Sequence, residues 1–395
     1  MKFLFIVTSY WAIGEMEIAV QFANDLKDEN DIRFLCPRCH EAYLKEKGFD
    51  TYLLYFKIGK LNRVILQNIE YNFSPDYIIL SDYLNYVFCE NHYGLNMDNL
   101  NCFHGKIGAF DLYNQSLQPR CMDTYGFKSK KFFIDKEKMD FLLLPCPLLD
   151  KDFSDYNNNI FAVPLINNIT TRSDSDKKAA KAELGIDESR KMLLVTNAQW
   201  QSTYKKYDIA VKFVEEADRV FYEILGELSE KYDVVIIGKE KDKDSKIKYM
   251  QSVPPSLFEK YINATDLFIS RNIISTSFAK IILRGIPGVV LINSDNQNHC
   301  YRCKMFPVGW YDYISSLEEK SLYFKLFEQI DMFEKSNCIS TIEEILRKEK
   351  LSKEFDNYLD KISKLMKPSD VFKYLERNNH NNGKTRRNNS DQQSE

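Results

Sequence analysis

The sequence contains 395 residues, of which 44% are hydrophobic and 28% are charged, and its formal net charge is −3. This length exceeds what one hydrophobic core usually supports, so two domains are expected. The small net charge argues against partners attracted by a strong positive field, namely nucleic acids and anionic lipids. No apolar run is long enough to cross a bilayer, and the first run, Phe3–Val7, is too short for a signal peptide. We therefore expect a cytoplasmic protein with a small-molecule substrate, no nucleic-acid partner and no integral membrane segment.

The first part of the chain alternates between strand and helix patterns. Lys2–Ser9 is typical of a buried strand, and a turn containing Gly14 leads into a helix over Glu15–Leu26. Further strands are predicted at Arg33–Leu35, Thr51–Phe56, Tyr77–Leu80, Asn101–Phe103 and Phe141–Leu144. This alternation predicts a parallel sheet in a Rossmann-like domain over residues 1–150.

A second alternation follows residues 151–187, whose Asn, Asp, Ser and Lys content is typical of a linker. It predicts another Rossmann-like domain over residues 188–377, whereas the polar residues 378–395 are expected to form a disordered tail. The expected strands are Met192–Thr196, Val234–Ile237, Leu267–Ser270 and Gly288–Ile292, and the expected helices are Tyr207–Tyr232, Pro255–Ile262 and Thr276–Arg284. The fold class is therefore α/β, with two doubly wound domains facing a cleft where ligands bind beyond the carboxyl ends of the strands.

The most informative motif begins with the predicted strand Leu267–Ser270. It continues into a hydroxyl-rich turn at a helix start, where free backbone N–H groups and the helix dipole favour a diphosphate. Polar side chains on the loop after the next strand suit sugar hydroxyls. The motif residues are Ser275, Thr276, Ser277, Lys280, Gly285, Pro287, Asp295 and Gln297. The alternative is an N-capped helix followed by an ordinary polar loop.

With these residues, the second half of the chain resembles the nucleotide-sugar glycosyltransferases of the GT-B fold, and the first half resembles them in architecture. The resemblance implies that Ser275–Ser277 hold the donor diphosphate and that Asp295 and Gln297 contact the transferred sugar. Lys280 departs from the family, which usually carries a ribose-binding glutamate there, because a lysine cannot accept hydrogen bonds. Either another group recognises the ribose, or Lys280 pairs with a donor phosphate, or the usual donor is lost.

Two loops of the second domain also reach the predicted cleft. Thr196 and Asn197 follow its first strand, and Gly238 and Lys239 follow a later one. The resemblance implies that these loops approach the diphosphate and base of the donor. The alternative for each is a polar loop in which glycine permits a tight turn.

The first domain offers candidates for the acceptor side. Gly14 would let the backbone approach a substrate, and Glu15 is a candidate general base, although it could simply complement the helix dipole. Asp82 at a strand end and His104 in a following loop are further candidate catalytic groups, and Asp111 is expected to contact the substrate. A histidine in such a place is also commonly a hydrogen-bonded structural residue.

The nine cysteines are too sparse for a disulfide framework and are expected to be reduced. Cys36 and Cys39, and likewise Cys300 and Cys303, have a spacing that can bind zinc, but they lie in different predicted domains. A bridging zinc would fix a cleft that must open, so no metal is expected. Asp174–Asp176 has the spacing of a metal-dependent sugar-transfer motif, but it lies in the predicted linker.

These features together predict an inverting, metal-independent glycosyltransferase without a cofactor. Residues 188–377 would bind a nucleotide-sugar as donor substrate, and residues 1–150 would bind the acceptor, which is a small molecule, natural product or peptide. A sugar-nucleotide epimerase of the same architecture is one alternative. A non-catalytic binding or partner subunit, suggested by Lys280, is the other.

Overall fold

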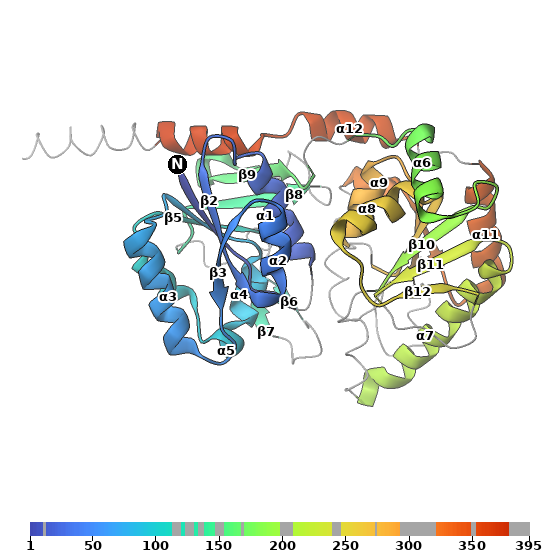
Figure 1. Cartoon of the computed structure of the whole chain (residues 1–395), viewed down its shortest axis with the longest axis horizontal. Coiled ribbons are helices and arrows are strands. Elements are labelled where there is room, and N and C mark those ends of the chain that lie inside the picture. Colours follow the sequence, from blue (N-terminus) through green and yellow to red (C-terminus); the bar gives the residue numbers. More distant parts are fainter. Residues whose placement is uncertain are drawn as a thin grey trace, which may run out of the picture.

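The computed structural model describes residues 1–10, 13–112, 120–122, 130–132, 138–146, 154–166, 170–197, 208–238, 246–272, 275–292, 321–348 and 353–378. They form two α/β units side by side, each built on a parallel sheet (Figure 1). The predicted fold class, with two doubly wound domains, is therefore confirmed. Among the described residues, no helix is both long and apolar enough to span a membrane.

The first domain contains a seven-stranded sheet in the order β3-β2-β1-β4-β5-β8-β9. Strand direction is parallel throughout, and strand order reverses between β1 and β4, which makes this pair the topological switch point. The strands are β1 (Lys2–Ile6), β2 (Asp31–Pro37), β3 (Asp50–Leu54), β4 (Tyr77–Leu80), β5 (Lys106–Phe110), β8 (Phe141–Cys146) and β9 (Ile160–Pro164). The helices are α1 (Gly14–Asn24), α2 (Arg38–Glu46), α3 (Gly59–Asn72), α4 (Tyr83–Phe88) and α5 (Glu90–Tyr93), and the pair β6 (Arg120–Met122) and β7 (Lys130–Phe132) is antiparallel.

One predicted strand is wrong. Residues Asn101–Phe103 do not form a strand; they lie at the end of the 3-10 helix η1 (Met97–Cys102), and the strand is β5, a few residues later. A side-chain contact favours the helical turn, because Asn99 Oδ1 accepts a hydrogen bond from the Asn96 amide at 2.8 Å. The shift matters for the site, because it changes which loop follows the strand.

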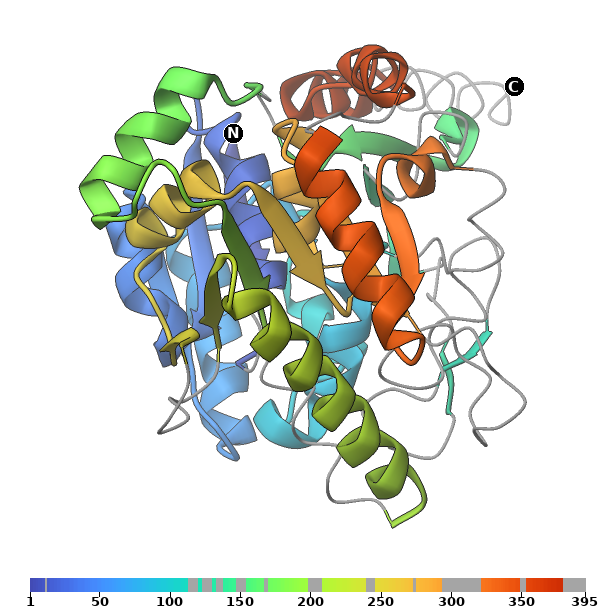
Figure 2. The same ribbon diagram turned by 90° about the vertical axis from the view of Figure 1, so that its right-hand side faces the viewer.

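The second domain contains a six-stranded sheet in the order β12-β11-β10-β13-β14-β15, with its switch point between β10 and β13. Its outer face is covered by α7 and α11, and α6 also lies toward the viewer in Figure 2. The strands are β10 (Met192–Thr196), β11 (Asp233–Ile237), β12 (Lys248–Met250), β13 (Leu267–Ser270), β14 (Gly288–Ile292) and β15 (Glu328–Asp331). The helices are α6 (Asp174–Leu184), α7 (Asp208–Ser229), α8 (Pro255–Ala264), α9 (Thr276–Leu283) and α11 (Lys335–Lys348), with the 3-10 helix η6 (Leu322–Lys325) before β15.

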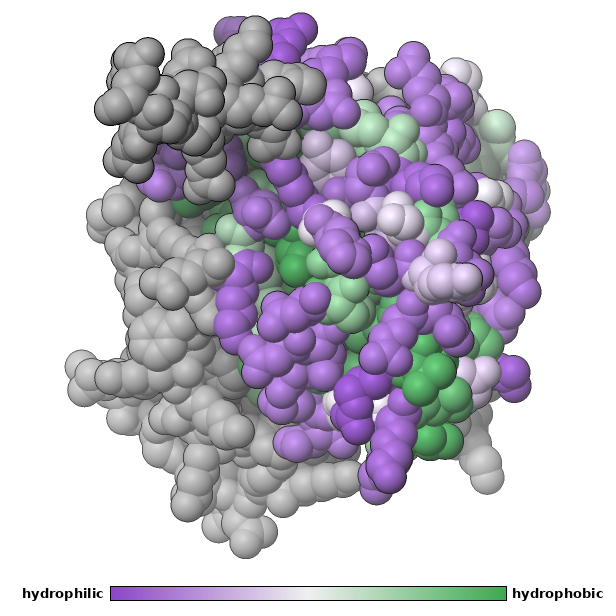
Figure 3. All heavy atoms as spheres, turned by 90° about the vertical axis from the view of Figure 1, so that its left-hand side faces the viewer, coloured by the Kyte–Doolittle hydropathy of each residue, from purple (hydrophilic) through white to green (hydrophobic). Residues whose placement is uncertain are grey.

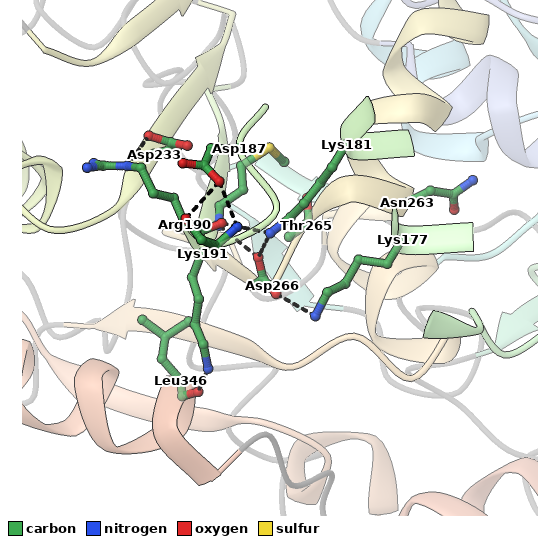
Figure 4. A network of polar contacts seen from close by, with 12 residues as sticks. Lys177, Lys181, Asp187, Arg190, Lys191, Asp233, Asn263, Thr265, Asp266 and Leu346 are labelled. Carbon is green, nitrogen blue, oxygen red and sulfur yellow. Dashed lines mark hydrogen bonds and ion pairs between the residues drawn. The ribbon is translucent and has the colours of Figure 1, made fainter. Parts of the chain in front are cut away.

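A buried ionic network attaches α6 to the amino edge of the second sheet. The Asp266 carboxylate binds Lys177 Nζ at 2.7 Å and Lys181 Nζ at 2.8 Å, and it also accepts from the Met192 amide at 2.8 Å (Figure 4). Although α6 lies within residues 151–187, it therefore packs as part of the second domain. In the same range, β9 joins the sheet of the first domain.

The first turn of α6 also explains the Asp174–Asp176 spacing. Ser173 caps the helix, and its hydroxyl accepts from the Asp176 amide at 3.1 Å while the Asp176 carboxylate accepts from the Ser173 amide at 3.0 Å. This reciprocal arrangement is a capping box. The two acidic residues therefore start a helix.

The end of the described chain returns to the first domain. After α12 (Phe355–Ser363), the helical residues 368–378 run along the first sheet (Figure 1). The buried Phe372 ring lies 4.7 Å from both Phe3 and Tyr77 and 5.8 Å from Phe141. Residues expected to belong to the second domain thus complete the aromatic core of the first.

Candidate functional site

The two domains meet at the amino ends of α1 and α9. A Cβ atom added to Gly14 would lie 2.8 Å from the Thr276 hydroxyl oxygen, so the missing side chain permits this close approach between domains. Since α1 follows β1 and α9 follows β13, the contact joins the switch points of both sheets. The sequence predicted that Gly14 lets the backbone approach a substrate; in the structure its open side faces Thr276.

The amino end of α9 carries the predicted diphosphate site. Ser275 caps the helix by accepting from the Phe278 amide at 3.3 Å. Thr276 and Ser277 form the first turn and are half-buried, and the first N–H groups of a helix have no intrahelical partner. The buried Phe278, whose ring lies 4.7 Å from Phe327, fixes the helix on the domain core. This end therefore presents hydroxyls and amides at the interdomain contact.

On the other side of that contact, Glu15 is buried and held in one orientation. Its Oε1 accepts from the Thr8 amide at 2.9 Å, and its Oε2 accepts from the Ser9 amide at 3.0 Å. The Asn85 side chain donates a third hydrogen bond, Nδ2 to Oε2, at 3.1 Å. These contacts tie α1 to the loop that follows β1.

Asn85 also binds Asp82, the residue that caps α4. Asp82 Oδ1 accepts from the Asn85 amide at 3.2 Å, and Oδ2 accepts from Asn85 Nδ2 at 3.0 Å. One side-chain amide therefore bridges two buried carboxyl groups. Asp111, at the carboxyl end of β5, is also buried and close enough to raise the pKa of Asp82. We call Glu15, Asp82 and Asp111 the carboxylate cluster.

Burial controls the proton affinity of this cluster. It raises the pKa of Glu15 to about 8, with an added contribution from the negative charge of Asp82. It raises the pKa of Asp82 to about 7, and the nearby Asp111 adds to that shift. Carboxyl groups that exchange a proton near neutral pH are suited to general acid–base chemistry. Three residues predicted separately from the sequence are thus brought together.

His104 lies elsewhere. It precedes β5, is exposed, and its Nδ1 lies 2.5 Å from Glu70 Oε1. The neighbouring Gly105 packs against the carbonyl of Pro75, which precedes β4. Both contacts place His104 at the amino edge of the sheet, whereas the carboxylate cluster is at the carboxyl edge. The structure therefore does not bring His104 together with the carboxylate cluster.

In the second domain, a buried arginine organises the loop after β10. Arg271 donates from Nη1 to Asp218 Oδ1 at 2.6 Å and from Nη2 to Asn197 Oδ1 at 3.1 Å. Its guanidinium lies over the Phe221 ring at 4.2 Å. Asn197 Nδ2 donates to the Tyr222 hydroxyl at 3.2 Å, so both ends of this amide are engaged.

Thr196 and Gly238, the other predicted residues in the described parts of these loops, contribute through the backbone. Thr196 is the half-buried last residue of β10. Gly238 has φ +101°, and a Cβ there would lie 2.1 Å from the Asn197 carbonyl oxygen. Glycine is thus required at position 238 for packing. Arg271 was not among the predicted site residues, although its place directly after a buried strand was the signal that could have indicated it.

Lys280 does not face the amino end of its helix. Its Nζ lies 3.1 Å from Glu17 Oε1 on α1 and also pairs with Glu259, which binds Arg284 at 2.7 Å. Although burial opposes ionisation of Glu17, Lys280 and the Tyr43 hydroxyl hold its pKa below the usual range. In this structure Lys280 therefore forms an interdomain ion pair, whereas a contact with a donor phosphate was one of the three alternatives predicted for it.

Several predicted residues lie outside the described part of the chain: Lys239, Asp295, Gln297, Cys300 and Cys303. Of the other cysteine pair, Cys36 is buried and Cys39 is exposed, and both are free. Within the described residues, no group of three or more His, Cys, Asp or Glu side chains could hold a metal ion.

Solved structures with similar architecture cover almost the whole chain. Spinosyn forosaminyltransferase SpnP has a TM-score of 0.58 at 10% identity, covering 95% of this chain and 98% of that one. Arabidopsis thaliana UGT89C1 complexed with UDP has a TM-score of 0.57 at 12% identity, covering 95% and 98%. A UDP-N-acetylglucosamine 2-epimerase has a TM-score of 0.53 at 11% identity, covering 97% and 96%.

These similarities establish the GT-B type of fold, which glycosyltransferases share with UDP-N-acetylglucosamine 2-epimerases. At this level of identity they show the fold alone. A search of curated protein sequences gives no significant match. Residues 22–298 and 294–378 match a family described as "Family of unknown function (DUF6365)", and the chain therefore belongs to that family.

Proposed function

We propose that this protein is a glycosyltransferase that uses a nucleotide-sugar donor and requires no metal. One observation carries the proposal: the buried carboxylate cluster and the amino end of α9 lie at the two switch points, which meet where Gly14 contacts Thr276. In this proposal, an anion site and a proton-accepting site lie on opposite sides of one interdomain contact. Solved structures of this fold include a complex with UDP and one with thymidine diphosphate, which supports a nucleotide diphosphate as the ligand.

In this function, the amino end of α9 binds the donor diphosphate through backbone N–H groups and the hydroxyls of Ser275, Thr276 and Ser277. The acceptor lies on the first domain. Its hydroxyl, amine or thiol gives up a proton to the ionised form of Glu15 as it attacks the anomeric carbon. The new glycosidic bond forms while the bond from the anomeric carbon to the diphosphate oxygen breaks. The diphosphate leaves with the electron pair, and a single displacement inverts the configuration.

A sugar-nucleotide epimerase is the second candidate, because three acidic side chains gather in one place. In that reaction one carboxylate would remove a proton from a sugar C–H bond and another group would return a proton to the opposite face. No acceptor would be needed. The two candidates differ in one measurable respect, because only the epimerase exchanges a carbon-bound hydrogen with solvent.

The first test is a thermal-shift screen with UDP, dTDP, GDP, ADP and their sugars, since a ligand that binds only the folded state raises its stability. Ser277→Leu should abolish the shift by blocking the first turn of α9. Ser336→Leu is a matched control, because Ser336 is also the second residue of its helix, α11. An undiminished shift for Ser277→Leu would refute the assigned donor site.

The reaction is then tested with the nucleotide-sugar that binds. We expect transfer to members of an acceptor library, detected by mass spectrometry, and no deuterium in the donor recovered from D₂O. Deuterium incorporation without an acceptor would identify an epimerase instead. Binding without either reaction would favour a non-catalytic partner subunit.

A further inference from the structure

Exposed hydrophobic side chains gather on one part of the first domain. Among the described residues, large hydrophobic side chains are exposed in two segments, at Tyr10, Ile13, Tyr55, Phe56, Ile58, Leu61 and Val64. The other described residues include only three large hydrophobic side chains that are similarly exposed, namely Met1, Tyr71 and Tyr156. Figure 3 shows a group of hydrophobic atoms low on the face of the molecule that includes α3. Apolar groups gathered in this way on a protein surface mark an interaction site.

The loop between β3 and α3 holds these side chains outward in a defined structure. The buried Asn62 side chain accepts from the Tyr55 amide at 2.8 Å and donates to the Tyr55 carbonyl at 2.7 Å. Gly59 packs against Gly94, since a Cβ on Gly59 would lie 3.0 Å from Gly94 Cα. The exposure of Phe56, at 50%, is therefore a fixed property of the loop.

Backbone strain supports the same conclusion. Lys57 has φ +58°, in the left-handed region that residues other than glycine rarely adopt. Its amide donates to the His92 carbonyl, at 2.6 Å, which fixes this conformation between the exposed Phe56 and Ile58. Strained backbone persists where surrounding contacts hold it, and it clusters at functional positions.

Cations are interspersed with the hydrophobic residues. Lys57, Lys60 and Arg63 are all exposed, and the sequence contains no acidic residue between Asp50 and Glu70. This local excess of positive charge is hidden by the net charge of −3 for the whole chain. We call the exposed side chains of residues 55–64, together with Tyr10, the Phe56 surface.

The Phe56 surface borders the candidate site. The Tyr10 ring lies 6.1 Å from that of Phe56, and both contact the His92 ring at 5.5 Å. Tyr10 directly follows Ser9, whose amide binds Glu15. The surface is therefore at the carboxyl edge of the first sheet, on the same side as the carboxylate cluster.

We propose that the Phe56 surface docks this protein on an anionic lipid bilayer. Phe56, Ile58 and Leu61 would enter the boundary between headgroups and acyl chains, and the three cations would contact anionic headgroups. A protein partner is less favoured. Its interface would have to contact the apolar side chains of the Phe56 surface and also neutralise the three cations interspersed with them. The small net charge of the whole chain predicted no lipid partner, and this proposal departs from that prediction because the positive charge is local.

The test is co-flotation of the full chain with vesicles of phosphatidylcholine alone or of phosphatidylcholine mixed with phosphatidylserine. We expect binding to the anionic vesicles only, weakening as salt screens the charges. Lys57→Asn with Lys60→Gln should weaken partitioning about 25-fold, which is about fivefold for each lost cation. Asparagine tolerates the left-handed backbone at position 57.

A variant of the hydrophobic residues, with two controls, distinguishes docking on lipid from docking on another protein. Phe56→Ser with Ile58→Ser should abolish flotation, whereas Tyr71→Ser and Lys178→Glu, which change exposed residues elsewhere, should leave it intact. Circular dichroism melts confirm that each variant folds. Wild-type protein that stays free of anionic vesicles at low salt overturns the proposal. So does a vesicle-independent change from dimer to monomer in the Phe56→Ser, Ile58→Ser variant, which would identify a protein interface.

Discussion

The carboxyl edges of the two sheets differ in whether their buried ionisable side chains have partners of opposite charge. In the first domain, no Lys or Arg among the described residues forms a salt bridge with Glu15 or Asp82, and a neutral amide from Asn85 bridges the two. In the second domain, the buried Arg271 is paired with Asp218 and lies over an aromatic ring. Burial without a nearby cation raises the pKa of a carboxyl group, whereas a buried arginine that is paired with a carboxylate stays charged. One edge can therefore exchange protons at neutral pH, and the other keeps a fixed charge distribution.

The largest expected effect comes from removing the proton acceptor. Glu15→Gln keeps the shape of the side chain but cannot take a proton, so kcat should fall about 10²- to 10⁴-fold. Glycosyl transfer to the best acceptor measures it. Glu17→Gln on the same helix is the control, and its kcat should stay within about tenfold of wild type. Equal losses in both variants would show that the effect is structural.

Breaking the compensated pair should cost stability. Asp218→Ala leaves the Arg271 guanidinium buried without its carboxylate, which we expect to lower the free energy of unfolding by about 3 kcal/mol. Urea denaturation measures this quantity. The double variant Asp218→Leu, Arg271→Met should recover most of the loss, because apolar replacement of a buried pair is often neutral. If the double variant stayed as unstable as Asp218→Ala, the other contacts of Arg271 would contribute more to stability than its pair with Asp218.

The uncompensated acids should make stability depend on pH. The folded pKa values of Glu15 and Asp82, about 8 and 7, lie above those of the unfolded chain. Between the two sets of values the folded state binds more protons, so stability falls as pH rises from about 5 to 8, by at most about 1.4 kcal/mol per pH unit for each group. Urea titrations across this range measure the slope. Glu15→Gln should flatten it, and an unchanged slope would contradict the assignment.

The smallest expected effect concerns the interdomain ion pair. Lys280→Met leaves the largely buried Glu17 without its cation, so it should cost about 2 kcal/mol and depend only weakly on salt. The exposed pair Lys364–Asp360 gives a matched control in Lys364→Met, which should change stability by no more than about 0.5 kcal/mol. Equal salt dependence in both variants would show that the interdomain pair is no stronger than a surface one.

Much of the fold could be predicted because its strands are buried on both faces. β4, β10, β13 and β14 have the predicted bounds, since each is a short apolar run before or after a turn signal. β9 was not predicted, because its five-residue apolar run lies within a longer stretch of linker-like composition, and its place in the sheet depends on pairing with β8. The return of residues 368–378 to the first domain is equally non-local.

The carboxylate cluster could be predicted in part, because its residues follow buried parallel strands. Glu15, Asp82 and Asp111 follow three parallel strands, and the carboxyl ends of parallel strands meet at one edge. His104 was grouped with these acids because a strand was predicted at Asn101–Phe103, whereas the histidine precedes the amino end of β5. Asn85 gave no signal, because a polar residue in a helix first turn acquires its role only when two distant carboxyl groups flank it.

The position of Phe372 has a consequence for biosynthesis. Domains of a growing chain generally fold in order, with the N-terminal domain first. Here the rings of Phe3, Tyr77 and Phe141 stay partly uncovered until the helix containing Phe372 has been translated and docked. The first domain to be made is thus the last to be completed, and until then part of its aromatic core stays exposed.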